Sequence, residues 1–198
     1  MPFIARKKVT KDMEKLEVLI AEGKDLSAHM LVRIDAIWQD AFPGNEAVDP
    51  KNRKCFAHDL FFVVSCPNDD IRAAGRLRPV SLTFMGTIYH IQGIADIVSV
   101  VHGKGYGKIL MTAMVDYLKK KKQTGVGFCV QKNAPFYEKY GCVIDAVLPE
   151  RFLYKNHAGK IIKNVHDEIV FSVHGNDGFM NAVSHNPREA VFIPCRHW

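Results

Sequence analysis

The stretch His102-Gly103-Lys104-Gly105-Tyr106-Gly107-Lys108 determines how the rest of the chain is interpreted. Apolar residues from 94 to 101 lead into it, and an amphipathic run from 109 to 118 follows it. Three glycines in five residues let the backbone turn sharply and approach a ligand without a Cβ in the way. The first N–H groups of the following helix lack intrahelical partners, and the helix dipole adds partial positive charge there. The stretch therefore predicts an anion site, for which phosphate is the usual ligand.

Two common phosphate-binding motifs do not fit this stretch. A Walker A loop needs a glycine where the chain has His102, and a Ser or Thr where it has Ile109. A dinucleotide fingerprint needs the spacing G-x-G-x-x-G, whereas the glycines here follow G-x-G-x-G. An ordinary glycine-rich turn between a strand and a helix stays open as the plain alternative.

The remaining pattern resembles the acetyl-CoA loop of the GCN5-related N-acetyltransferase (GNAT) superfamily. In that loop, Arg or Gln is followed after two residues by Gly and, one residue later, by Gly or Ala. His102, Gly105 and Gly107 fill these positions, with histidine in place of Arg or Gln. Because the family's loop contacts phosphate mostly through backbone amides, the resemblance implies that the site tolerates the histidine.

A second stretch, Asn-Ala-Pro-Phe-Tyr-Glu-Lys-Tyr-Gly-Cys at 133–142, resembles the family's segment between a short helix and the last hairpin. It follows the loop by one helix and one strand, as the family requires. The resemblance is firm over 92–143, weaker over 16–91, and ends near Val173. It implies an α+β fold with a mixed, mostly antiparallel sheet, whose splayed central strands are flanked by helices. We therefore predict an acetyltransferase domain over 1–173 and an extension over 174–198 that packs on it or on a partner subunit.

Composition and charge restrict the remaining classes. The chain has 198 residues, 47% of them hydrophobic, which is enough for a packed core. No apolar run reaches the roughly 20 residues that span a bilayer. Five scattered cysteines without C-x-x-C spacing, and no export signature, predict a cytoplasmic protein with free thiols. The net charge of +6 is not interleaved with aromatic residues as in nucleic-acid modules, and coenzyme A is a sufficient anionic partner.

Periodicity and capping residues predict most of the elements. A strand is expected at 16–21, where a helical reading is also open, and a helix follows the N-cap Ser27. The further predictions are strands at 60–66, 71–83 and 88–101, a helix at 108–122, a strand at 127–131, a helix at 134–140, and paired strands at 141–147 and 166–173. Arg72, Arg76 and Arg78 share one face of the strand 71–83, which we interpret as solvated. Trp38 and Phe42 are interpreted as core rather than as an acceptor site.

The resemblance also implies site residues. The pantetheine arm of acetyl-CoA would lie along the end of the strand 88–101, the diphosphate on the glycine loop, and the thioester oxygen near amides of 98–100. Asn133 would hydrogen-bond the pantetheine region, and Tyr137 would lie near the thioester sulfur. The implied cofactor-binding residues are Ile97, Val98, Ser99, Val100, His102, Gly103, Lys104, Gly105, Tyr106, Gly107, Lys108, Asn133 and Tyr137.

Acetyl transfer to an amine needs an acid for the departing thiolate and a base for the amine. Tyr137 is the candidate acid, because a phenol with a pKa near ~10 keeps its proton at neutral pH. A packing role for this tyrosine stays open. Asp96 is the first candidate base, His90 and His102 are alternatives, and bulk water is a further one.

We therefore predict an N-acetyltransferase that uses acetyl-CoA and acts on a small-molecule or peptide amine. The alternatives are an acyl-CoA-binding regulatory module without turnover and an acyltransferase for longer chains. The segment 71–101 resembles family branches that modify aminoglycosides or sugar-linked amines. Dimers are common in the family, and the acceptor and oligomeric state stay open. Cys195, His197 and His185 lack the paired spacing of a zinc site, so no metal is expected.

Overall fold

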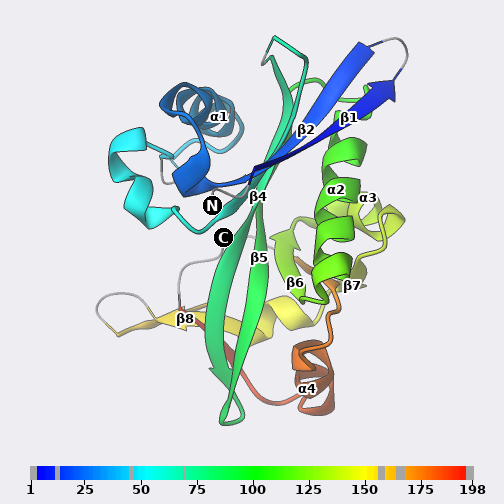
Figure 1. Cartoon of the computed structure of the whole chain (residues 1–198). Coiled ribbons are helices and arrows are strands. Elements are labelled where there is room, and N and C mark those ends of the chain that lie inside the picture. The colour runs from blue at the N-terminus through cyan, green and yellow to red at the C-terminus, as the bar shows by residue number, and fades with distance from the viewer. Residues whose placement is uncertain are drawn as a thin grey trace. The chain divides into compact units, whose positions relative to one another are not determined.

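The computed structural model describes residues 4–194 apart from 12–13, 45–46, 69, 156–158 and 164–167. The chain forms two compact units, one from 1–78 with 95–114 and the other from 79–94 with 115–198. Three elements contribute to both units along their length (Figure 1). They are β4 (Ile71–Phe84), β5 (Thr87–Ser99) and α2 (Tyr106–Lys121).

The first unit contains an antiparallel run of strands in the order β1-β2-β3-β4-β5. Its further elements are β1 (Ile4–Lys11), β2 (Glu14–Glu22), α1 (Ala28–Ala41), β3 (Leu60–Ser65) and the short helices η1 (Gly23–Asp25) and η2 (Pro50–Cys55). The predicted strand at 16–21 is confirmed. β1 was not predicted, because its exposed residues 4–8 give no apolar pattern and it is held by backbone pairing with β2.

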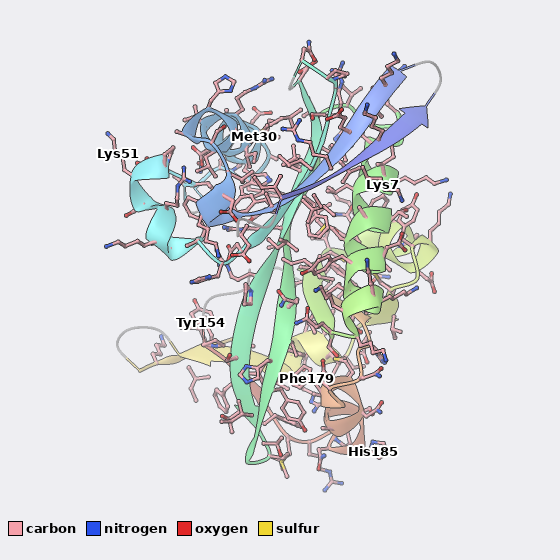
Figure 2. The ribbon with its side chains drawn as sticks, in the orientation of Figure 1. Lys7, Met30, Lys51, Tyr154, Phe179 and His185 are labelled. Carbon is pink, nitrogen blue, oxygen red and sulfur yellow. The ribbon has the colours of Figure 1, made fainter. Side chains whose placement is uncertain are left out.

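Helix α1 closes one face of the first unit. Its predicted N-cap is confirmed, since the Ser27 hydroxyl accepts a hydrogen bond from the Met30 amide at 3.1 Å. Met30 lies on α1 in Figure 2 and is buried with Trp38 in one apolar cluster. Trp38 is 3% exposed and stacks on Phe61 with ring centroids 5.6 Å apart. The interpretation of Trp38 as a core residue is therefore confirmed.

The second unit contains strands in the order β4-β5-β6-β10-β7 and a separate three-stranded sheet in the order β11-β8-β9. Its elements are β6 (Gly125–Cys129), η3 (Gln131–Asn133), α3 (Ala134–Lys139), β7 (Val143–Asp145), η4 (Leu148–Arg151), β8 (Phe152–Lys155), β9 (Ile161–Lys163), β10 (Ile169–Val173), α4 (Phe179–His185) and β11 (Val191–Ile193). The predicted pairing of β7 with β10 is confirmed.

Pairing within the sheets gives the mixed, mostly antiparallel character that the sequence predicted. β5 and β6 run parallel, and their backbones pair at Gln92 with Gly125 and at Gly93 with Val126. β6 stays paired with β10 as far as Cys129. β6 begins two residues earlier than predicted because Gly125 lies beneath Leu118 and Ile94, so its missing Cβ reflects close packing rather than a turn.

Residues after Val173 belong to the second unit. The N-terminal residue of α4, Phe179, is fully buried (Figure 2). Its ring centroid lies 6.4 Å from that of Phe84 and 5.2 Å from that of Tyr89. β11 pairs in parallel with β8. Five residues of the predicted extension belong to the buried core of this unit, namely Phe179, Met180, Val183, Val191 and Ile193, while residues 195–198 lie outside the described part of the chain.

A carboxylate links α4 to the turn before β6. Asp177 accepts hydrogen bonds from the backbone N–H and the hydroxyl of Thr124 at 2.9 and 2.6 Å, and from the Phe179 amide at 3.0 Å. Thr124 is 1% exposed, so loss of this acceptor leaves buried donors unpaired. We expect Asp177→Ala to lower the free energy of unfolding by about 2 to 3 kcal/mol in urea denaturation.

The exposed Asp116 on α2 provides the matched control, and Asp116→Ala should change stability by no more than about 0.5 kcal/mol. Equal stability of the two variants would show that the carboxylate of Asp177 does not hold α4 to the turn.

Candidate functional site

The glycine loop lies between the end of β5 and the start of α2, within the first unit. Gly103 and Gly105 adopt left-handed backbone conformations with φ of 76° and 75°. The Ile109 amide donates to the Gly105 carbonyl, which begins the hydrogen bonding of α2. Tyr106 is buried at the first turn, and the Arg72 guanidinium lies 5.9 Å from its ring centroid. The left-handed residues Gly103 and Gly105 thus turn the backbone so that α2 begins directly after the loop.

This loop has the properties of an anion site. Residues 101–104 are exposed, and a Cβ added at Gly103 would meet nothing within 4 Å. Glycine is therefore favoured at 103 by the backbone conformation and not by lack of space. The first turn of α2 follows closely after these exposed residues, and it presents amide groups and the positive end of the helix dipole to the loop.

The strand segment before the loop is held on both faces. The Ile97 side chain lies with Leu110 and Met114 of α2 over Gly75. Val98 packs on the opposite side, against the apolar cluster that contains α1. The Val100 amide donates to the Arg72 carbonyl at 3.0 Å, which ties the end of β5 to β4.

The remaining predicted pantetheine residue, Ser99, is partly exposed, and its hydroxyl donates to the Val101 carbonyl at 3.1 Å. The four predicted pantetheine positions, 97 to 100, therefore form one ordered segment. It leads directly to the loop at 102–108.

β5 carries one more residue than the neighbouring part of β4. Near the turn of this hairpin, Ser81 Oγ lies 2.8 Å from His90 Nδ1. At the other end of the two strands, the backbone carbonyl of Arg72 accepts a hydrogen bond from the Val100 amide. Ser81 and Arg72 are nine positions apart along β4, whereas His90 and Val100 are ten positions apart along β5. Asp96 lies between these pairs with φ of 52°, a left-handed conformation inside a strand. The extra residue is therefore a β-bulge at Asp96.

The Asp96 side chain belongs to a buried ion cluster. Its Oδ2 accepts from Arg76 Nε at 2.6 Å, and another Arg76 nitrogen, Nη1, donates to Asp59 Oδ2 at 3.0 Å. Arg78 Nε also donates to Asp59, at 3.3 Å. The Arg76 guanidinium lies 5.1 Å from the centroid of the Trp38 ring. The structure therefore places the predicted base Asp96 in an ion pair with Arg76.

This cluster corrects one expectation from the sequence. The side-chain alternation of β4 predicted a solvated face for three arginines, but Arg76 is only 6% exposed. Burial raises the pKa of the Asp59 carboxyl above its ordinary value, while Arg76 and Arg78 act in the opposite direction. The sequence contained a hint of this cluster. Asp59 directly precedes the apolar strand β3, and the antiparallel neighbour β4 carries arginines that can lie opposite this carboxylate.

Tyr137 and Asn133 lie in the second unit. Tyr137 on α3 is buried and stacks on Phe171 with ring centroids 3.7 Å apart. Burial raises the pKa of its phenol above the ordinary value, and the thiols of Cys129 and Cys142 act in the same direction. The phenol therefore keeps its proton throughout the neutral range, as a general acid requires. Asn133 is exposed at the end of η3, directly before α3.

The two alternative bases occupy different surroundings. His90 is exposed on β5 and hydrogen-bonds Ser81, while His102 is exposed in the glycine loop. No group of three or more His, Cys, Asp or Glu side chains that could hold a metal occurs among the described residues. Cys195 and His197 lie outside those residues. Within the same described ranges, no helix is long and apolar enough to cross a membrane.

This arrangement is typical of α+β proteins that bind an anion at a helix N-terminus preceded by a glycine loop. A sequence profile described as an acetyltransferase (GNAT) domain matches residues 24–144, more than half of the chain. The chain therefore belongs to the GNAT acetyltransferase family. No curated protein matches it.

Solved structures show the same fold at low sequence identity. The GNAT N-acetyltransferase YhbS from Escherichia coli, in complex with CoA, is 12% identical with a TM-score of 0.59, over 95% of this chain and 93% of that one. The catalytic domain of the Tetrahymena GCN5 histone acetyltransferase, in complex with coenzyme A, is 14% identical with a TM-score of 0.51, over 83% and 95%. The chain also covers 32% of a conserved Enterococcus faecalis protein of unknown function, at 17% identity over 63% of this chain with a TM-score of 0.49.

Proposed function

We propose that this protein transfers an acetyl group from acetyl-CoA to a primary amine of a small molecule or peptide, directly within a ternary complex. The observation that carries the proposal is the loop at 102–108. Its two left-handed glycines lead from an exposed loop into a helix N-terminus, in a chain of the GNAT acetyltransferase family. Two proteins of similar fold were crystallised with CoA, which supports the same ligand here.

The residues of the first unit fit the phosphate and pantetheine parts of CoA. Main-chain amides from Gly103 to Lys108 would bind the diphosphate, because they combine unpaired donors with the helix dipole. Polar backbone groups of 97–100 would bind the pantetheine arm along β5. Asn133 of the second unit is the further proposed pantetheine contact. The bound coenzyme would supply a thioester, and the net charge of +6 favours such a polyanion.

The transfer requires two proton movements, one to the thiolate and one from the amine. The amine nitrogen forms a bond to the acetyl carbon as the carbon–sulfur bond breaks, so the thiolate must gain a proton and the amine must lose one. Tyr137 donates to the thiolate, since its raised pKa keeps the phenol protonated. The amine proton passes to solvent water, because the carboxylate of Asp96 is already engaged by Arg76.

The test is an acyl-transfer assay with the purified chain, acetyl-CoA and a panel of primary amines. We expect release of free thiol that depends on the amine, and an acetylated product by mass spectrometry. Butyryl-CoA and octanoyl-CoA run in parallel report on chain length, and acetyl-CoA should be preferred. Tight CoA binding without thiol release for any amine would contradict the enzyme and favour a binding module.

A further inference from the structure

The buried ion cluster around Arg76 includes Asp96, the residue directly before the strand segment 97–100 that is assigned to the cofactor arm. We propose that Arg76 is a positioning residue, which holds the bulge at Asp96 and thereby sets the register of 97–100 for acyl-CoA. This inference rests on the proposed function, since it concerns how the same site is held in shape. The role of Asp96 as a general base stays a prediction, and substitutions of Asp96 separate the two roles.

Arg76 is restrained on three sides within the first unit. Its Nε donates to Asp96 Oδ2 at 2.6 Å, its Nη1 donates to Asp59 Oδ2 at 3.0 Å, and its guanidinium lies over the Trp38 ring. The side chains of Arg76, Asp59 and Asp96 are 7%, 6% and 11% exposed. A planar guanidinium presents several donors in a fixed geometry, so it can hold two carboxylates at once. One residue on β4 thus links the segment before β3 to the bulge of β5.

The bulge needs such a restraint because its backbone is unfavourable. Only glycine adopts a left-handed conformation without a steric penalty, and aspartate and asparagine are the next most tolerant residues. If Asp96 returned to an extended conformation, the extra residue would be absorbed and the segment 97–100 would shift by one position. A shift by one residue moves every side chain to the opposite face of the sheet.

The packing of the following residues shows what such a shift would disturb. Ile97 now lies with Leu110 and Met114 of α2, while Val98 packs on the opposite side. An exchange of faces would separate Ile97 from both α2 residues and reverse the direction of each backbone N–H from 97 to 100. The donors proposed to bind the pantetheine arm would then face the wrong way. A side chain that never contacts the ligand can therefore control its binding.

The cluster offers a matched control for Arg76. Arg78 lies on the same strand and the same face, and it also donates to Asp59, but no hydrogen bond or ion pair joins Arg78 to Asp96 among the described residues. Loss of Arg78 removes one charge and one ion pair near the same carboxylate. It leaves the bond to the bulge in place. Comparing Arg76→Gln with Arg78→Gln thus separates the restraint of Asp96 from a general effect of charge.

Substitutions of Asp96 test the same idea from the other partner. Asparagine retains tolerance for the left-handed conformation and an oxygen that can accept from Arg76 Nε, whereas alanine retains neither. Both substitutions remove the carboxylate. A positioning role therefore predicts that Asp96→Ala is much more harmful than Asp96→Asn. A general base predicts that the two are equally harmful.

The experiment measures kcat, the KM for acetyl-CoA and the affinity for CoA by calorimetry, with thermal melting to show that each variant is folded. We expect Arg76→Gln to raise the KM and the Kd at least about tenfold over Arg78→Gln. Asp96→Ala should raise both by a similar factor over Asp96→Asn. The pH profile of kcat should be the same in Asp96→Asn and in the wild type. If Arg76→Gln does not fold, the Asp96 pair decides the question alone.

Two results would overturn the inference. One is equal KM and Kd values in Arg76→Gln and Arg78→Gln, with an active wild type. Another is a loss of turnover in Asp96→Asn as large as in Asp96→Ala, together with loss of the acidic limb of the pH profile, which would make Asp96 the base. Failure of the wild-type chain itself to bind CoA would refute the proposed function instead, so the two failures are distinguishable.

Discussion

Gly103→Asp should weaken CoA binding at least about 100-fold, because it places a carboxylate where the diphosphate is proposed to bind. Aspartate tolerates the left-handed conformation of this position (φ of 76°), and an added Cβ has open space around it. The loop should therefore keep its shape, and the loss should come from charge. Calorimetric titration with CoA measures the effect.

Gly86 supplies the control for this substitution. It lies in the turn between β4 and β5 with φ of 77°, and an added Cβ there also meets nothing within 4 Å. Gly86→Asp thus introduces the same charge in the same backbone conformation, away from the loop. We expect its CoA affinity to stay within about twofold of the wild type. Equal losses in the two variants would show that the loop is not the phosphate site.

Tyr137→Phe should lower kcat by about 100-fold or more, which is the usual contribution of a general acid. Removing the hydroxyl keeps the ring that stacks on Phe171, so the fold and the CoA affinity should change little. Because the pKa of the phenol is raised, its ionisation should cause no fall of kcat on the alkaline side of neutral pH. The loss should consequently be uniform across neutral pH, as measured by steady-state kinetics.

Tyr140 is the matched control, since it follows α3 directly, is only partly buried, and has its ring centroid 5.0 Å from that of Phe136. Tyr140→Phe should leave kcat within about twofold of the wild type. A Tyr137→Phe variant with normal turnover would remove this phenol from the mechanism and leave it as a packing residue.

The sequence predicted those parts of the fold that depend on local signals. The loop at 102–108 and the cap at Ser27 are encoded by residues that lie next to one another in the chain, and both are found as expected. The turn between the predicted strands 71–83 and 88–101 is also local, and its residues Met85 and Gly86 have positive φ. Local backbone requirements of this kind restrict which residues can occupy a position.

The pairing of β8 with β9 and β11 was beyond the same reasoning. β8, β9 and β11 are short, and β11 joins β8 across nearly forty residues of chain, as in the pair Val191 with Phe152. Arg76 alternates like a solvated strand residue, and only the positions of Asp59 and Asp96 in the fold explain its burial. The bulge at Asp96 escaped prediction for a related reason, since one extra residue is visible only against the partner strand.

The central claim is that the amides of 103–108 bind the diphosphate of coenzyme A. The measurement that tests it most directly is calorimetric titration of the wild-type chain with CoA, beside the Gly103→Asp variant. The account predicts one binding site per chain in the wild type, with a Kd in the micromolar range, and a loss of that binding in the variant. A folded wild-type chain that shows no heat of binding at millimolar CoA would contradict it.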